Sequence, residues 1–209
     1  MIVLLGAPGS GKGTQSRLLA GRDGYKIFAV GEILRAEIAS GTECGKILGA
    51  ALQKGEFAPL DVVIRLLKQY VVDKNYVLDG FPRNMAQVDE LETFIAEHGQ
   101  LAGNVTVVDF IVPIDILKDR LEHRRLCKVC DGALLQDAKE CTFCGHYSED
   151  AYIRDDDSNA QAVARRLEIF HQEKDALVEY YSKQGIYHAI DATLPVEEVY
   201  AKLKEAVAS

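Results

Sequence analysis

The sequence lacks tryptophan, has only two methionines and five prolines among its 209 residues, and contains no long apolar run. No stretch approaches the roughly 18 consecutive apolar residues that a membrane-spanning helix needs, so we expect no membrane partner. Neither a basic region nor a cleavage site precedes Gly6, so we expect no secretory signal and a cytoplasmic location. Repeats, Pro- or Ser-rich linkers and low-complexity tracts are also missing, which favours one core with small insertions.

The sequence has fewer basic than acidic residues. The chain has 24 Lys and Arg against 32 Asp and Glu, a formal net charge of −8. A net acidic protein is a poor candidate for general nucleic-acid binding, so we expect no nucleic-acid partner. The hydrophobic fraction of 48% is ordinary for a globular protein and supplies enough material for a core.

The most informative motif is the glycine-rich stretch Gly6–Thr14, with the sequence GAPGSGKGT. It follows the apolar run Ile2–Leu5 and precedes a helical segment, which is the strand–loop–helix context of a phosphate-binding loop. Backbone N–H groups and the helix N-terminus would hold a polyphosphate, while Lys12 reaches its β- and γ-phosphates. The next residue is Gly13 instead of the usual Ser or Thr, so Mg²⁺ would depend on water, substrate phosphates and Asp79. A simple glycine turn is the less favoured alternative.

Short apolar runs alternate with helical stretches along the chain. This alternation predicts an α/β fold, in which a parallel sheet is covered by helices on both faces. The predicted strands are rich in Val, Ile and Tyr and are bounded by turn residues. They are Ile2–Leu5, Lys26–Val30, Asn75–Asp79, Val105–Val112 and Ile186–Ile190.

Two regions interrupt this alternation. Residues 31–58 contain two helical stretches, Glu32–Ala39 and Glu43–Lys54, with no strand between them. Residues 126–155 contain four cysteines, many polar residues and little helical periodicity. We interpret both regions as insertions that project from one core.

A second phosphate-related motif is Tyr76–Arg83, with the sequence YVLDGFPR. Asp79 ends a predicted buried strand, where an acidic residue can orient Mg²⁺ or its water ligands. Arg83 follows Pro82, and its planar guanidinium suits bidentate phosphate binding. Taken alone, Asp79 is compatible with a strand-end cap and Arg83 with a surface residue. Together with the glycine-rich loop, they favour a functional interpretation.

Further arginines are spread along the chain. Any one arginine is more often a solvated surface residue than a ligand, but a phosphate loop makes a converging set plausible, because phosphoryl transfer needs charge neutralisation on both sides of the moving group. No candidate general base stands out in these motifs. This favours transfer between phosphates, since a phosphate acceptor is already deprotonated. The arginines are Arg35, Arg120, Arg124, Arg154, Arg165 and Arg166.

Four of the five cysteines form two Cys-x-x-Cys units, Cys127 with Cys130 and Cys141 with Cys144, separated by ten residues. This pattern is typical of a tetrahedral four-thiolate site, for which zinc is the default and iron or cobalt are possible. Two local disulfides or four free thiols are less expected alternatives in a reducing compartment. Four protein ligands leave no open position, so the metal's role is predicted to be structural, replacing a core that a short polar insertion cannot build.

These motifs resemble the adenylate kinase family of nucleoside monophosphate kinases. The resemblance implies reversible phosphoryl transfer from Mg-ATP to AMP, giving two ADP, by a monomer. It implies a three-layer P-loop fold with a five-stranded parallel sheet. Its core would comprise residues 1–29, 59–121 and 159–209, with an AMP-binding insertion at 30–58 and a metal-bearing lid at 122–158. The matching segments are Gly6–Thr14, Gly31–Arg35, Leu78–Arg83 with Gln87, Asp119–Arg125, and Arg154 through Leu167.

The resemblance also implies roles at the matched positions. Lys12 and Arg124 would contact the ATP phosphates, with Arg120 packed on the ATP adenine and the backbone near Leu194 touching it. Arg154 and Arg166 would bridge the donor and acceptor phosphates. The other positions implied to contact the ATP phosphates are Gly9, Ser10, Gly11, Gly13 and Thr14. Those implied to hold AMP are Arg35, Gly80 and Arg83 around its phosphate and Gln87 at its adenine.

Two departures from the family pattern leave alternatives open. Val30 stands where many members have a Thr that contacts the acceptor base, so a UMP/CMP-type kinase remains an alternative. Gln87 favours AMP, because UMP- and CMP-specific relatives usually have Asn there. The segment from Arg154 to the next arginine pair is one residue longer than usual, so either Arg165 or Arg166 could be the ligand, with the following Leu167 favouring Arg166.

One alternative belongs to a different class, an ATP-dependent zinc-ribbon module that binds nucleic acid. The locally basic stretch Arg120–Lys128 supports it. The net acidic charge and the run Asp155–Asp157 oppose it.

Overall fold

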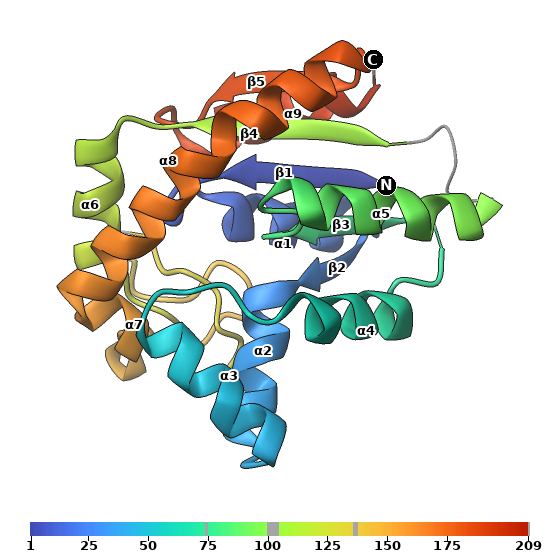
Figure 1. Ribbon diagram of the computed structural model, residues 1–209. Helices are drawn as coiled ribbons and strands as arrows, with labels where there is room; N and C mark the ends of the chain where they lie inside the picture. The colour runs from blue at the N-terminus through green and yellow to red at the C-terminus, as the bar shows by residue number, and fades with distance from the viewer. Residues whose placement is uncertain (74, 100–104, 136–137, 209) are drawn as a thin grey trace.

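The computed structural model describes residues 1–73, 75–99, 105–135 and 138–208. A five-stranded sheet with the strand order β2-β3-β1-β4-β5 lies at its centre, and all neighbouring strands are parallel (Figure 1). The predicted fold class and all five predicted strands are confirmed, with ends shifted by one residue at several positions. The strands are β1 (Ile2–Gly6), β2 (Lys26–Ala29), β3 (Tyr76–Asp79), β4 (Thr106–Ile111) and β5 (Tyr187–Asp191).

Helices connect the strands, and several begin at a side-chain cap. Thr42, Asn84 and Asn159 each accept a backbone N–H from the first turn that follows them. Val30, predicted to end a strand, instead begins a helix. The helices are α1 (Lys12–Asp23), α2 (Val30–Ala39), α3 (Glu43–Gln53), α4 (Leu60–Tyr70), α5 (Met85–Glu97), α6 (Ile114–Glu122), α7 (Asp155–Ser158), α8 (Ala160–Lys183) and α9 (Val196–Ala208).

The hydrophobic core has two layers because successive strand residues point to opposite faces of the sheet. On β1, Ile2 and Leu4 pack in a cluster that includes residues of α1 and α9. Val3 and Leu5 pack in the other cluster, which includes residues of α4, α5 and α8. The sheet is therefore covered on both faces, as Figure 1 shows.

Helices α2 and α3 form a hairpin that projects from the sheet (Figure 1). A Cβ atom added at Gly45 would lie only 2.5 Å from the Glu37 carbonyl oxygen, so a glycine is needed where the two helices approach. Leu34 of α2 and Leu48 of α3 are buried in the larger core cluster. The hairpin is thus continuous with the core at its base.

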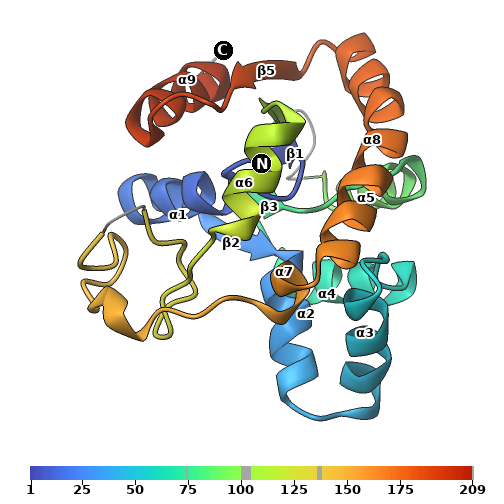
Figure 2. The same cartoon turned by 90° about the vertical axis from the view of Figure 1, so that its left-hand side faces the viewer.

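The described part of residues 126–152 has little regular structure. Its ladder contacts are isolated bridges that join Leu126 to Ala133 and Tyr152, and Glu140 to Tyr147. A short 3₁₀ turn, η2 (Ser148–Asp150), follows them. Figure 2 shows this irregular segment beside α1. In the described ranges, no helix has the length and apolarity that crossing a membrane requires.

Candidate functional site

The glycine-rich loop joins the end of β1 to the start of α1. Gly6, Gly9 and Gly11 have φ values of 138°, 85° and 98°, which side-chain-bearing residues rarely adopt. Gly11 is the N-cap of α1, so the loop delivers its backbone N–H groups and the helix N-terminus to the same point. This geometry suits a bound polyphosphate.

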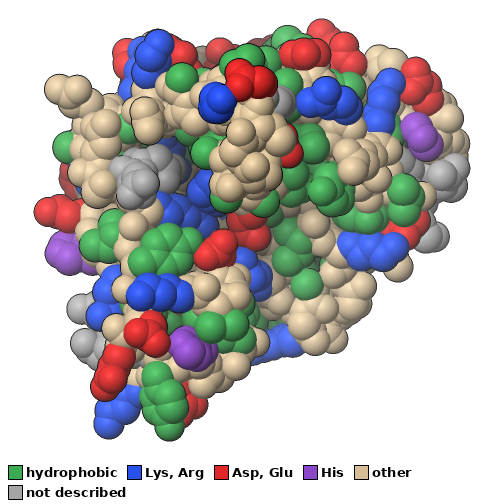
Figure 3. All heavy atoms as spheres, turned by 90° about the horizontal axis from the view of Figure 1, so that it is seen from below, with side chains coloured by type: hydrophobic (Ala, Val, Ile, Leu, Met, Phe, Trp, Pro, Cys, Tyr) green, Lys and Arg blue, Asp and Glu red, His purple; other side chains and the backbone are tan. Residues whose placement is uncertain are grey.

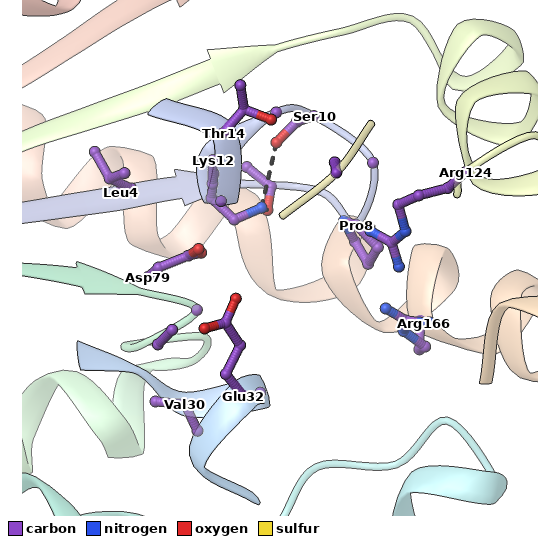
Figure 4. Close-up of a pocket in the computed structure, with 18 of the residues that line it drawn as sticks. Leu4, Pro8, Ser10, Lys12, Thr14, Val30, Glu32, Asp79, Arg124 and Arg166 are labelled. Atoms are coloured by element: carbon purple, nitrogen blue, oxygen red, sulfur yellow. Dashed lines mark hydrogen bonds between the residues drawn. The ribbon is translucent and has the colours of Figure 1, made fainter. Parts of the chain in front are cut away.

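The ammonium group of Lys12 lies inside this loop. Its Nζ donates to the carbonyl oxygens of Gly6 at 2.7 Å and Ala7 at 2.8 Å, and to Ser10 Oγ at 3.2 Å (Figure 4). Burial lowers the pKa of Lys12 to about 8, against the opposing effect of the Asp79 carboxylate. A phosphate would supply the negative charge that this buried ammonium group lacks.

The Asp79 carboxylate lies next to Gly13, within van der Waals contact of where a side chain there would begin. A Cβ atom added at Gly13 would lie 3.5 Å from Asp79 Oδ2, and the Ser16 hydroxyl donates to the same oxygen at 3.4 Å. The carboxylates of Asp79 and Glu32 lie on one side of Lys12, while Arg124 and Arg166 lie on the other (Figure 4). Oxygen ligands of this kind fit Mg²⁺ held through water.

The loop after β3 positions Arg83 and Gln87. Arg83 Nε donates to the Gly80 carbonyl at 2.7 Å, and a Cβ atom added at Gly80 would lie 2.8 Å from Arg83 Nη2. Gln87 Oε1 accepts the backbone N–H of Arg83 at 2.8 Å. The Arg83 guanidinium also lies 5.9 Å from the centroid of the Phe57 ring. These contacts fix an arginine and a buried amide side by side.

Arg120 and Leu194 are brought together at another part of the site. Arg120 Nη2 donates to the Ala192 carbonyl at 3.0 Å, and burial lowers the pKa of Arg120, opposed by Asp191. Arg35 lies on α2, where its Nη1 would be 3.3 Å from a Cβ atom added at Gly31. The two arginines therefore approach the site from α6 and from the helical hairpin.

A buried carboxylate joins two of the predicted phosphate ligands. Asp157, whose side chain is 0% exposed, accepts from Arg166 Nη1 at 3.0 Å and from Arg124 Nε at 2.8 Å, with a second contact from Arg124 Nη2. Burial lowers the pKa of Arg124, and Asp157 opposes this shift. Arg154 Nε is buried with no partner among the described residues. Arg165, in contrast, pairs with Glu168 and is about half exposed.

All of the predicted catalytic and nucleotide-binding residues line a single cavity of about 850 Å³. Arg165 is not among its lining residues, whereas Arg166 is. Seen from below, Lys and Arg side chains are recessed in a hollow at this end of the molecule (Figure 3). An overall acidic protein therefore concentrates cations around one cavity, which suits a polyanionic ligand.

Sequence reasoning missed several residues of this site. Asp157 belongs to an acidic run, and nothing in its local sequence indicates that it pairs with Arg124 and Arg166. Glu32 lies within the segment Gly31–Arg35 but was given no role. Arg17, which also lines the cavity, lies on α1 outside every motif that was considered.

The four paired cysteines form a cluster in which all the sulfur atoms lie within 4.8 Å of one another. Cys127 Sγ lies 3.5 Å from Cys144 Sγ, and Cys130 Sγ lies 3.5 Å from Cys141 Sγ, so each close pair joins the two units. All four are free cysteines and form no disulfide. Tetrahedral coordination with Zn–S bonds of about 2.3 Å would separate the sulfurs by roughly 3.8 Å, so the cluster fits a metal ion.

The surroundings of Cys127 favour its thiolate. Burial raises the pKa of Cys127, but the backbone N–H groups of Val129 and Cys130, together with the thiols of Cys144 and Cys130, lower it to about 7. Burial instead raises the pKa of Cys130 to about 12. A thiolate is the form that binds a metal. The donor set and the backbone therefore both suit a soft divalent cation.

Comparisons with known proteins agree with this geometry. The family model described as Adenylate kinase matches residues 4–186. An adenylate kinase of Thermodesulfovibrio yellowstonii is 34% identical, with the alignment covering 95% of this chain and 94% of the relative. One from Archaeoglobus fulgidus is 32% identical over 97% of this chain and 95% of its own length. One from Methanosarcina mazei is 34% identical over 99% and 98%, respectively.

We predict that ATP binding weakens as the pH rises through about 8, because a phosphate binds the protonated form of Lys12 and the pKa of this group is about 8 in the free protein. Above about pH 8, the affinity for ATP should fall by close to tenfold for each pH unit. Titration calorimetry between about pH 7 and 9.5 checks it, a range in which the ATP phosphates are already ionised.

Two variants serve as controls for this prediction. Lys12→Met should lower kcat by about a hundredfold or more and abolish the pH dependence. Lys118→Met, an exposed lysine outside the cavity, should keep both properties of the wild type. A wild-type affinity that stays constant across pH 8 would contradict the assignment.

We also predict that Asp157→Asn destabilises the ligand-free protein by about 1–3 kcal/mol, because two partly buried guanidinium groups lose their shared counter-charge. ATP phosphates should supply the missing charge and recover most of the loss. Differential scanning fluorimetry with and without ATP measures both effects. Asp150→Asn, at an exposed carboxylate of the irregular segment that contacts His146, is the matched control. An equal loss of Tm with and without ATP would show that phosphate does not replace Asp157.

Removal of the metal should lower the Tm and loosen residues 126–152 while the sheet stays folded, because this segment has few other contacts to hold it. Limited proteolysis, circular dichroism and elemental analysis of the same samples test this prediction. Cys127→Ser should reproduce the effect, whereas Cys44→Ser, outside the paired units, should not. A protein that contains no metal and melts identically after chelation would refute it.

Proposed function

Because the chain belongs to the adenylate kinase family, we propose that the cavity beside the glycine-rich loop holds Mg-ATP and AMP together and aligns their phosphates. The chain is a phosphotransferase, and its reaction is reversible transfer from ATP to AMP, giving two ADP. The observation that carries the proposed arrangement is that all the predicted phosphate ligands line this one cavity. Arginines from four separate segments reach it around the glycine-rich loop.

On the donor side, the loop from Gly9 to Thr14 would hold the ATP phosphates through its backbone N–H groups, with Lys12 and Arg124 as cations. Arg120 is held at the Ala192 carbonyl, so its guanidinium plane is fixed for packing on the adenine. Leu194 lines the same cavity and would touch this base. We therefore assign the ATP adenine to the space between α6 and the β5–α9 connection.

On the acceptor side, Arg35 and Arg83 would bind the AMP phosphate. Gln87 Oε1 already accepts the N–H of Arg83 at 2.8 Å, so we assign the adenine contact to Gln87 Nε2. This amide hydrogen would meet an acceptor nitrogen of adenine, whereas the N1–H of guanine would oppose it. Val30 is 4% exposed and adds packing but no hydrogen bond, so Gln87 carries the choice of base.

Transfer requires neutralisation of the charge that spreads over the moving phosphoryl group. Arg154 and Arg166 would contact donor and acceptor phosphates, and we assign Arg166 this role in preference to Arg165 because only Arg166 lines the cavity. The buried Arg154 Nε without a partner is a further donor for an oxyanion. No protein base is required, because the attacking AMP phosphate is already ionised.

Members of the family use Mg²⁺ with ATP. Asp79 and Glu32 would hold it through water, since Gly13 offers no hydroxyl ligand and the Asp79 carboxylate lies beside it. When bound, the ion would shield the charge of the phosphates. The protein's own contribution is to position these carboxylates opposite the arginines.

We assign residues 30–58 as the AMP-binding insertion and residues 122–158 as a lid over ATP, with the remainder as the core. Closure of both would exclude water and so favour transfer to AMP over hydrolysis. The cysteine cluster would hold Zn²⁺ as a structural ion within the lid. The reduced state of these cysteines supports a cytoplasmic location, and we propose a monomer without a nucleic-acid partner.

The acceptor preference is the most direct test. With ATP as donor, kcat/KM for AMP should exceed those for UMP, CMP and GMP by at least about tenfold, because Gln87 Nε2 is assigned to donate to an acceptor nitrogen of adenine. A coupled assay across the four acceptors measures this preference. Gln87→Leu should reduce the advantage of AMP while leaving the KM for ATP nearly unchanged. Rapid turnover with UMP and none with AMP would replace the proposal with a UMP/CMP-type kinase.

A further inference from the structure

The side chain of Arg17 connects three parts of the molecule. Arg17 lies on α1, and its Nη2 donates to Glu32 Oε1 on α2 at 2.8 Å. Its Cζ lies 5.8 Å from the centroid of the Phe143 ring, which belongs to the second Cys-x-x-Cys unit. The phosphate-loop helix, the helical hairpin and the cysteine segment therefore meet at one guanidinium group.

Phe143 packs beside the cysteine cluster. A Cβ atom added at Gly132 would lie 2.5 Å from Phe143 Cδ2 and 3.3 Å from Cys130 Sγ, so the ring lies against the Gly132 backbone, two residues after the first Cys-x-x-Cys unit. Phe143 itself lies between Cys141 and Cys144. Any displacement of the cluster would therefore carry the ring with it and change its contact with Arg17.

The chemistry of arginine allows both contacts at once. A planar guanidinium can donate from its edge to a carboxylate while its face lies against an aromatic ring. The Arg17 side chain is only 18% exposed and that of Glu32 is 36% exposed, so solvent screens this group incompletely. Without Arg17, Glu32 would present an uncompensated carboxylate to a cavity that receives phosphates.

Glu32 and Arg35 lie on the same helix, α2, which begins at Val30. We propose that Arg17 is a positioning residue that couples closure of the cysteine lid to the orientation of α2, so that ATP binding strengthens AMP binding. This inference rests on the proposed roles of the lid and of the helical hairpin. Linkage requires the coupling to be reciprocal, so AMP should strengthen ATP binding by the same factor.

Titration calorimetry of the metal-loaded protein tests this coupling. The Kd of AMP is measured with and without a saturating non-hydrolysable ATP analogue that carries an imido bridge. Loss of a partly buried cation–π contact corresponds to about a two- to tenfold decrease in affinity. Arg17→Gln and Phe143→Leu should each reduce the coupling factor by that amount. In Phe143→Leu, which keeps the pair between Arg17 and Glu32, the Kd of AMP alone should change less than about twofold.

Conservative variants separate positioning from folding. Phe143→Tyr keeps the ring face and should retain the coupling, and Arg17→Lys should retain only part of it, because an ammonium group cannot stack as a plane. Tyr147→Leu removes another lid aromatic ring that is 67% exposed and should leave the coupling unchanged. In the double variant Arg17→Gln/Phe143→Leu, the loss should not exceed that of either single variant, since both remove one contact.

The proposal is overturned if Arg17→Gln and Phe143→Leu keep the wild-type coupling factor, or if Tyr147→Leu lowers it equally. It is also overturned if the losses in the double variant simply add. Unchanged coupling in the variants can be distinguished from a failure of the proposed function. If the wild type bound no AMP and transferred no phosphate to it, the proposed function itself would fail, whereas normal turnover with unchanged coupling would remove only the role of Arg17.

Discussion

The confinement of positive charge at the end of one parallel strand is the constraint on which the rest of the site depends. Lys12 is held by backbone carbonyls within a loop of left-handed glycines, and burial makes its charged form costly. Asp79 offsets part of this cost from one side. Around Lys12, the positively charged arginines that line the cavity repel one another. A polyphosphate in this cavity would reduce that repulsion by supplying a counter-charge.

Asp157 shows how the protein manages this repulsion without a ligand. One buried carboxylate receives hydrogen bonds from both Arg124 and Arg166, so two guanidinium groups are oriented before any phosphate arrives. The cysteine segment differs, because it has too few apolar residues to fold around a hydrophobic core. Its four sulfur atoms are gathered instead, with backbone N–H groups directed at them. In the first case one carboxylate orients two arginine side chains, and in the second one cluster of sulfur atoms holds the cysteine segment together.

Much of the fold could be predicted from the sequence because its signals are local. The alternation of apolar runs and helical stretches identified all five strands, and the glycine-rich loop identified the point where β1 meets α1. The end of β2 was wrong by one residue, since Val30 favours strands by propensity but begins α2. Its packing in the core overrides that preference. The predicted ligands each lie in a compact motif, and all of them line the one cavity.

What could not be predicted depends on contacts between distant segments. The bridge from Asp157 to Arg124 spans 33 residues, and the contact between Arg17 and Phe143 crosses from α1 to the cysteine segment. Neither leaves a pattern in the sequence, because an acidic run and an isolated arginine are common on solvated surfaces. Spacing leaves Arg165 and Arg166 as alternatives, and of the two only Arg166 lines the cavity.

The position of β1 in the middle of the sheet has a consequence for synthesis on the ribosome. β1 precedes both of its neighbours along the chain, since it pairs with β3 and with β4, whose residues 106–111 are synthesised much later. Arg166 follows later still, on α8. The nascent N-terminal strand must therefore wait with an unpaired edge, a state that is prone to aggregation. Bound nucleotide can therefore protect this edge only after α8 has been made.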